Sequence, residues 1–379
     1  MNPIARTDRS LVGQWFWTVD HWLIMAILLL MVTGAVLTSA ASPPAAMRIG
    51  QEDFYFVKRH FVFLPITVAM VVGLSLLKRP QVTAFCLGLL GLSLALTVGT
   101  LFIGQADDGM VNGAARWIRV GGLSLQPSEL IKPSFIVVTA WLFCLGARNP
   151  KVPGLLIVLG LLAVITTLLI RQPDLGMTML ILAGFIIQLY LAGMPVQVVM
   201  IPCGVLVAIL AVAYATFDHV AQRIDRFLSP AASNPFDQIA FALKSFGNGG
   251  WTGTGPGDGR FKQHLPDAHT DFIFAVVGEE FGFFGCFVLI ALLGFVVLRG
   301  LTRLARQDDL FITIAAGGLL AQFGLQALIN MASAVALIPT KGMTLPFLSY
   351  GGSSLLSVGI TMGLVLALTR RSAMPQGAS

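Results

Sequence analysis

Ten apolar runs, each about as long as a helix that crosses a bilayer, dominate this chain of 379 residues. A transmembrane helix needs roughly 17 to 25 mostly apolar residues to cross the hydrocarbon core. The runs leave short polar connections, except for one long loop at 217–271. The expected spans cover residues 22–40, 61–77, 82–103, 130–145, 154–170, 176–192, 196–216, 272–298, 310–335 and 352–369. The sequence therefore predicts an all-α integral membrane protein of about ten transmembrane helices, in one polytopic domain over residues 1–379.

The composition excludes a soluble globular protein. Charged residues make up 11% of the chain and hydrophobic residues 56%, whereas roughly a quarter of the residues of a soluble domain are charged. The net charge of +6 comes from basic residues that stand singly or in pairs at the ends of apolar runs, which is a topology signal and not a nucleic-acid-binding face. The four cysteines lie inside apolar segments without metal-ligand spacing, which argues against a disulfide framework or a zinc site.

Lys and Arg in the short connections predict the orientation. An even number of spans puts both termini on one side, and that side carries eleven Lys and Arg against seven on the other, with the long loop left out. Because basic residues are retained on the cytoplasmic side, we expect cytoplasmic termini. The amino terminus resembles a signal peptide, but Asp8 and Asp20 interrupt it, so an uncleaved first span is expected. The loops around Arg116 and Lys341 and the long loop are then external, and the chemistry is expected there.

The long loop has 55 residues and includes the glycine-rich segment 246–259. It is too short and too polar to form a core of its own, so we expect it to fold onto the helix bundle. Its GxGxG spacing lacks a preceding strand and a GKS or GKT ending, which argues against a Rossmann turn or a P-loop. A tightly turning loop, with backbone amides available to an anion, is the remaining interpretation.

A few charges lie where the apolar pattern should exclude them. Lys132, Glu279 and Glu280 fall within expected spans, and Glu129 and Asp271 stand at span entrances. Such residues cost a few kcal/mol on insertion scales and therefore need a partner, a cavity or a function. Glu129 and Lys132 are three residues apart and can pair on one helix face. Either they form a structural ion pair, or Lys132 extends from the first helix turn to the membrane interface, or Lys132 faces a wet, outward-opening cavity and holds a carboxylate there.

Asp271 directly precedes the eighth apolar run. An Asp at this place is typical of a helix N-cap, and a helix amino terminus also favours the ionised carboxylate. Capping is therefore compatible with accepting a proton or a metal ion. Glu279 and Glu280 point in different directions around the helix, so we expect one to face the bundle and the other a neighbouring helix or partner.

Several basic residues lie on the outer side: Arg116, Arg119, Arg223, Arg226, Arg260 and Lys262. A solvated basic surface explains any one of them alone. Together they suit an anionic headgroup or a pyrophosphate, because guanidinium groups bind phosphate oxygens bidentately.

Five segments together resemble one known family. They are Asn112–Ile118 (NGAARWI), Gln126–Glu129 (QPSE) with Lys132, Gln172–Gly176 (QPDLG), His269–Phe274 (HTDFIF) with Glu279 and Glu280, and Lys341–Ser354 (KGMTLPFLSYGGSS). In this order they resemble the SEDS family, the FtsW and RodA proteins of bacterial cell-wall synthesis. Segments 342–352 and 223–228 are more similar to the division members, FtsW, than to the elongation members, RodA. Asn112 departs from the pattern, since many relatives have Lys there.

The resemblance implies a function. SEDS proteins are ten-helix proteins of the bacterial inner membrane that act as peptidoglycan glycosyltransferases, polymerising lipid II on the periplasmic side. The division members act in septal wall synthesis with a class B penicillin-binding protein and other divisome membrane proteins. Asp271 matches the family's essential aspartate, and Glu129 and Lys132 match polar residues of the cavity beside it.

The chemistry agrees with these assignments. Glycosyl transfer from an undecaprenyl-pyrophosphate donor needs a base near the acceptor hydroxyl and positive charge near the departing pyrophosphate. The base is assigned to Asp271. The positive charge is assigned to Lys132 with Arg116, Arg223 or Arg226. No cofactor is expected to be built in, and a divalent cation, Mg²⁺ or Mn²⁺, is compatible with carboxylate and phosphate oxygens.

Two other functions remain open at the level of sequence. Buried charges and glycine- and proline-broken segments such as 343–352 also suit alternating access, which would make the protein a lipid II flippase. A division scaffold that recruits the penicillin-binding protein is the other alternative.

Overall fold

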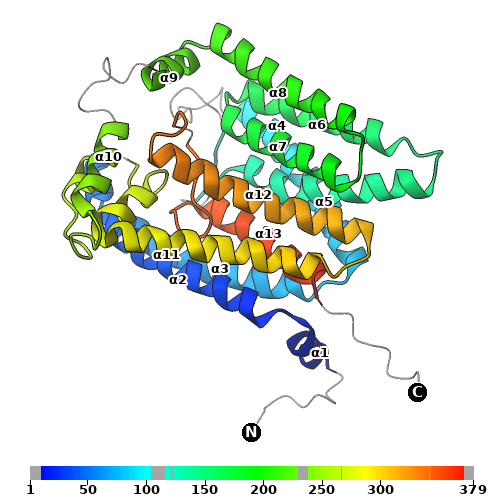
Figure 1. The fold of residues 1–379 in the computed structure, drawn as a ribbon, viewed down its shortest axis with the longest axis horizontal. Coiled ribbons are helices and arrows are strands. Elements are labelled where there is room, and N and C mark those ends of the chain that lie inside the picture. The colour runs from blue at the N-terminus through cyan, green and yellow to red at the C-terminus, as the bar shows by residue number, and fades with distance from the viewer. Residues whose placement is uncertain are drawn as a thin grey trace.

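The computed structural model describes residues 10–103, 116–120, 123–228, 238–265, 267–340 and 342–370. All ten expected spans are helical, and most of these helices run side by side along the long direction of the molecule (Figure 1). Their bounds are α2 (His21–Arg48), α3 (Tyr55–Ser75), α4 (Arg79–Ile103), α5 (Pro127–Arg148), α6 (Gly154–Arg171), α7 (Leu175–Leu191), α8 (Val196–Thr216), α11 (Ile273–Leu304), α12 (Leu310–Ala334) and α13 (Gly352–Leu368).

Among the described residues, eight of these helices are long and apolar enough to cross a membrane, and α7 and α13 are shorter apolar helices. The predicted helical membrane fold is confirmed. The connections hold α1 (Leu11–Thr18), α9 (Asp218–Leu228), α10 (Gln238–Gly249) and the 3₁₀ turn η2 (Phe261–His264). They also hold a short antiparallel strand pair that the sequence did not predict, β1 (Ile118–Val120) and β2 (Leu123–Leu125).

Helices α5, α12 and α13 form the buried centre of the bundle. Helix α3 packs on α13, α4 on α5, and α11 on both α12 and α2. Helix α8 packs mainly on α7 and α9, and its apolar side chains are mostly exposed. Exposed apolar faces on peripheral helices of this length are what contact with lipid requires.

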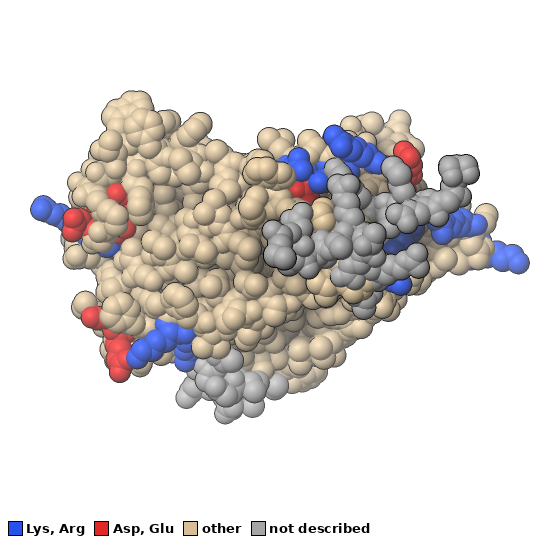
Figure 2. Space-filling view, turned by 90° about the horizontal axis from the view of Figure 1, so that it is seen from below, with Lys and Arg blue, Asp and Glu red and all other residues tan. Residues whose placement is uncertain are grey.

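The two ends of the described chain meet at one end of the bundle. The Trp15 indole donates to Ser75 Oγ at 2.7 Å, and the Arg370 guanidinium donates to the neighbouring Leu77 carbonyl at 3.0 Å. Asp20, the N-cap of α2, pairs with Arg299 and Arg303 of α11 at the same end. On the face shown in Figure 2, charged side chains gather toward the two ends and leave an uncharged band between them, as a spanning protein requires.

The described parts of the long loop fold onto the helix bundle as expected: α9 packs on α8, and residues 238–265 pack on α11 at a break in that helix. Gly282 has φ +64° and ψ −161°, which interrupts the helical hydrogen bonds. The amides of residues 254–255 donate to the carbonyls of residues 279–280 at 3.0 and 3.1 Å, and the amides of residues 283–284 donate to the carbonyls of residues 250–251 at 2.9 and 3.2 Å. The glycine-rich segment thus replaces the missing helical partners, which buried backbone groups cannot do without.

Both glutamates of α11 bind this same loop. The Glu279 carboxylate accepts the backbone N–H groups of residues 260–262 at 2.7–2.9 Å, and the Glu280 carboxylate pairs with Lys262. The predicted contact with a neighbouring helix is present at Glu279, whose carboxylate also accepts from the Asn248 side-chain amide of α10 at 3.1 Å. The prediction that the two carboxylates face different surroundings is wrong, because both bind the same loop. The break at Gly282 allows the loop to wrap around this part of the helix, so the loop amides bind an internal carboxylate.

Candidate active site

Asp271 lies in a turn that leads into α11. The N-cap of α11 is Phe272, and it makes no side-chain capping bond, so the N-cap interpretation of Asp271 is wrong. The turn over residues 267–272 places Asp271 one residue too early to cap. Instead, Asp271 lines a cavity of about 270 Å³, in which its Oδ2 lies 3.6 Å from the position of a Cβ on Gly342.

The main chain of this turn is tied to distant parts of the sequence. The carbonyls of residues 269–271 accept, in order, the Tyr350 N–H at 2.8 Å, the Ser349 hydroxyl, and the side-chain amide of Asn330 at 2.9 Å. The His269 ring packs on Phe56, with centroids 4.0 Å apart. Three consecutive anchored carbonyls hold the turn in one conformation and so fix where the Asp271 side chain begins.

Burial raises the pKa of the Asp271 carboxyl to about 7; the nearby negative charge of Asp267 adds to the effect, and Arg223 on α9 opposes it. Desolvation therefore opposes the ionised form that a helix amino terminus would favour. A carboxyl with a pKa near the working pH is well suited to accept a proton in a reaction.

Glu129 and Lys132 form the ion pair that their spacing predicted. Pro127 opens α5 as its first residue, a preferred place for proline, and Glu129 follows in the first turn, where a negative charge is favourable. Lys132 Nζ lies 2.6 Å from Glu129 Oε2 and donates to Gln326 Oε1 at 2.9 Å, and both charged side chains are buried.

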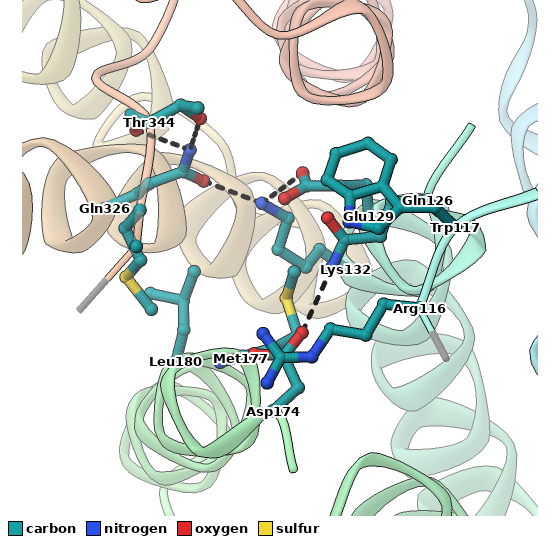
Figure 3. Close-up of a pocket in the computed structure, with 12 residues that line it drawn as sticks. Arg116, Trp117, Gln126, Glu129, Lys132, Asp174, Met177, Leu180, Gln326 and Thr344 are labelled. Carbon is teal, nitrogen blue, oxygen red and sulfur yellow. Dashed lines mark hydrogen bonds and ion pairs between the residues drawn. The ribbon is translucent and has the colours of Figure 1, made fainter. Parts of the chain in front are cut away.

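This pair also lines a second cavity of about 100 Å³, where side chains of several elements converge (Figure 3). The ion pair is therefore present, and both of its side chains also line a cavity. That this cavity is wet and opens outward stays a prediction. Glu129 lines both cavities, as do Trp117, Gln126, Gly342 and Thr344. The Asp271 side and the Lys132 side of the site therefore adjoin along one wall.

Arg116 reaches the smaller cavity from the segment before β1. Its Nε donates to the Gln172 carbonyl at 2.8 Å and its Nη2 to the Pro173 carbonyl. In the same wall, the Gln126 amide donates to Asp174 Oδ2 at 3.0 Å (Figure 3). Within the described part of the chain, no carboxylate lies within ion-pair distance of Arg116, so no ion pair neutralises the charge that it brings to the lining of this cavity.

The other predicted basic residues differ in how they relate to the site. Arg223 is exposed on α9, close enough for its charge to act on Asp271. Arg226 belongs to the same helix, but its side chain lies outside the described residues, as do the Arg119 side chain, Asn112 and Lys341. Lys262 is buried against Glu280, which removes it from the set of phosphate ligands.

The sequence reasoning did not single out Arg59, which lines the 270 Å³ cavity together with Asp271. Its guanidinium lies over the Tyr55 ring, 4.4 Å from the centroid. Arg59 stands in the first turns of α3, so the available signal was a basic residue at the outer end of a span. A basic residue at the end of a span is equally well explained by membrane topology, so this signal did not identify the site.

The chain is similar to known proteins over nearly its whole length. Residues 20–374 match the FtsW/RodA/SpoVE family, described as "Cell cycle protein". The chain belongs to this family. Among curated relatives, a protein of Caulobacter vibrioides is 42% identical over 100% of this chain and 96% of its own length, and one of Aliivibrio salmonicida is 35% identical over 92% and 88%. Both are named "Probable peptidoglycan glycosyltransferase FtsW".

Solved structures share the fold. A chain from "Structural coordination of polymerization and crosslinking by a peptidoglycan synthase complex" is 25% identical, with a TM-score of 0.75 over 93% of this chain and 97% of that one. The Thermus thermophilus rod shape determining protein RodA is also 25% identical, with a TM-score of 0.61 over 93% and 96%. The arrangement of the helices in this SEDS protein is thus that of its relatives.

Proposed function

We propose that this SEDS protein is a peptidoglycan glycosyltransferase that polymerises lipid II into glycan strands, with Asp271 as the general base. The observation that carries the proposal is the cavity that Asp271 shares with Glu129, next to the cavity of Lys132 and Arg116. The names of the full-length relatives support the same activity.

The reaction needs one proton acceptor and one site for the leaving group. An Asp271 carboxylate oxygen takes the proton of the acceptor sugar hydroxyl. At the same time, the hydroxyl oxygen attacks the anomeric carbon of the donor. The bond from this carbon to the pyrophosphate oxygen breaks, and undecaprenyl pyrophosphate leaves with the electron pair. Because negative charge develops on the leaving group, fixed cations stabilise the transition state more than the ground state.

Among the described residues, three cations line the two cavities: Arg59, Arg116 and Lys132. Lys132 shares its charge with Glu129, whereas both arginines face their cavities without a carboxylate partner in the described residues. We assign pyrophosphate binding to these three residues and expect Arg223 and Arg226 of α9 to approach the substrate from outside.

A divalent cation fits the donor chemistry of the smaller cavity. Glu129 and Asp174 both line it, and Mg²⁺ is commonly held by one or two carboxylates together with substrate phosphates. In that case, the ion would add positive charge at the leaving group. The described residues contain no cluster of three or more metal-ligating side chains, so binding would depend on the substrate.

We further assign the protein to the bacterial inner membrane, with this site facing the periplasm and with a role in cell division. The excess of Lys and Arg on the side of the termini supports the orientation, and the names of the relatives support the division role. A class B penicillin-binding protein is the proposed partner, since the chain shares its fold with part of a synthase complex that couples polymerization to crosslinking.

The test is lipid II polymerisation by the purified protein with its partner at pH 8. Asp271→Asn should abolish glycan formation. Asp267→Asn, which removes a carboxylate from the same turn, should retain it. Full polymerisation by folded, membrane-inserted Asp271→Asn would refute the assignment. Lipid II translocation in vesicles without polymerisation by the wild-type complex would favour the flippase.

A further inference from the structure

Helix α12 carries three buried amide side chains in a row. Gln322, Gln326 and Asn330 are spaced by four residues and so share one helix face, and each is at most 4% exposed. Polar side chains are expensive inside a membrane bundle unless they bind a partner. The two amides nearest the site, Gln326 and Asn330, bind groups that line the cavities.

Asn330 holds two main-chain segments together. Its Nδ2 donates to the Asp271 carbonyl at 2.9 Å and to the Met343 carbonyl at 2.6 Å. Both protons of the amide are therefore used, one on each wall of the site. The opposite orientation of the amide would place its oxygen against two carbonyls, which is repulsive, so the hydrogen bonds fix which atom is nitrogen.

Gln326, one helix turn from Asn330, joins the Lys132 side chain to the main chain of Thr344. Its Oε1 accepts from Lys132 Nζ at 2.9 Å and its Nε2 donates to the Thr344 carbonyl at 3.0 Å. Base and cation are thus anchored to neighbouring turns of one rigid helix, and the segment that contains Met343 and Thr344 is anchored between them.

We propose that Asn330 is a positioning residue for the glycosyl transfer. It lines neither cavity and acts through the Asp271 main chain, setting the position of the carboxylate relative to Lys132. This inference rests on the proposed function, because it assumes that Asp271 is the base. Misplacing a catalytic group by about 1 Å costs on the order of a hundredfold in rate.

The test compares Asn330→Leu with a matched control, Gln188→Leu. Gln188 of α7 is fully buried and donates to the Ile136 carbonyl at 2.7 Å, and it lines neither cavity. Both substitutions remove a buried amide that joins two elements, and both should lower the thermal unfolding midpoint. Asn330→Leu should lower kcat for lipid II at least about tenfold with KM nearly unchanged, whereas Gln188→Leu should leave both constants within about twofold.

Equal kcat values for the two variants, or a loss in Asn330→Leu confined to KM, would overturn the inference. If Asn330→Leu does not fold, Asn330→Ser keeps one donor and should give an intermediate kcat; a wild-type kcat in Asn330→Ser would overturn it as well. Asp271→Asn is assayed in parallel. Activity in Asp271→Asn refutes the proposed base, while an inactive Asp271→Asn beside a fully active Asn330→Leu refutes only the positioning role.

Discussion

The pKa of Asp271 predicts a pH profile that a typical aspartate would not produce. If the group is the general base and its pKa is about 7, kcat/KM should fall on the acid side with unit slope, because only the ionised form accepts the proton. The ionised fraction is about 91% at pH 8 and about 9% at pH 6, which gives a loss of roughly tenfold over this interval. An aspartate with the ordinary value of 3.8 would lose about 1%.

The causes of the raised pKa provide the internal test. Asp267→Asn removes a neighbouring negative charge and should move the acid limb to lower pH; Arg223→Gln removes an opposing positive charge and should move it to higher pH. Initial rates of lipid II polymerisation by the complex at subsaturating substrate, between pH 5.5 and 8.5, measure both shifts. A flat profile between pH 6 and 8, or shifts of the opposite sign, would refute the reasoning.

Three further substitutions test the structure. Asp271→Asn should stabilise the fold at pH 8 by up to about 4 kcal/mol. The pKa of Asp271 is higher in the folded than in the unfolded protein, so the wild-type protein loses stability as the pH rises from about 4 to about 7. The gain in thermal midpoint of the variant should therefore vanish near pH 4. Lys132→Met should destabilise by about 3–5 kcal/mol because it leaves Glu129 buried and unpaired, and adding Glu129→Gln should restore the thermal midpoint but not the activity; equal midpoints for single and double variants would contradict this. Gly282→Ala should destabilise by more than about 1 kcal/mol, since the residue has a positive φ and its Cβ would lie 2.4 Å from the Gly253 amide nitrogen; unchanged protease resistance of the loop at 250–262 would show that the break in α11 tolerates a side chain.

The break in α11 has a consequence for how the site is held. The turn with Asp271 joins the short helical segment before Gly282, and this segment is bonded to the long loop through Glu279, Glu280 and main-chain groups. Lys262 extends the connection to α2 through the Ala40 carbonyl at 3.2 Å. The loop therefore supports the catalytic turn from one side while α12 supports it from the other.

The sequence predicted the helices well because hydropathy is a local property. For α8 the predicted and observed bounds coincide, and for α12 and α13 they differ by one residue. The pairing of Glu129 with Lys132 was also predictable, since it depends only on helix periodicity. The pairing of strands 118–120 and 123–125 was not, because these short strands carry no long alternating pattern.

The functional environment of Asp271 depended on contacts that no local pattern encodes. Its carbonyl is bound by Asn330, 59 residues away, and the Thr270 carbonyl by Ser349, 79 residues away. Those contacts place the carboxylate in the cavity and not on the helix end, and the resulting desolvation sets its pKa. For the same reason, sequence alone misassigned Glu279 and Glu280.

By itself, then, the sequence determined that this protein spans a membrane and which ionisable groups interrupt its apolar segments, because both follow from residue type and spacing. Only the tertiary structure decided which of those groups share a cavity, which are bound by the long loop, and which one has a pKa suited to proton transfer. Burial and electrostatic interaction depend on distances in space, and those distances are set by the packing of elements far apart in the chain.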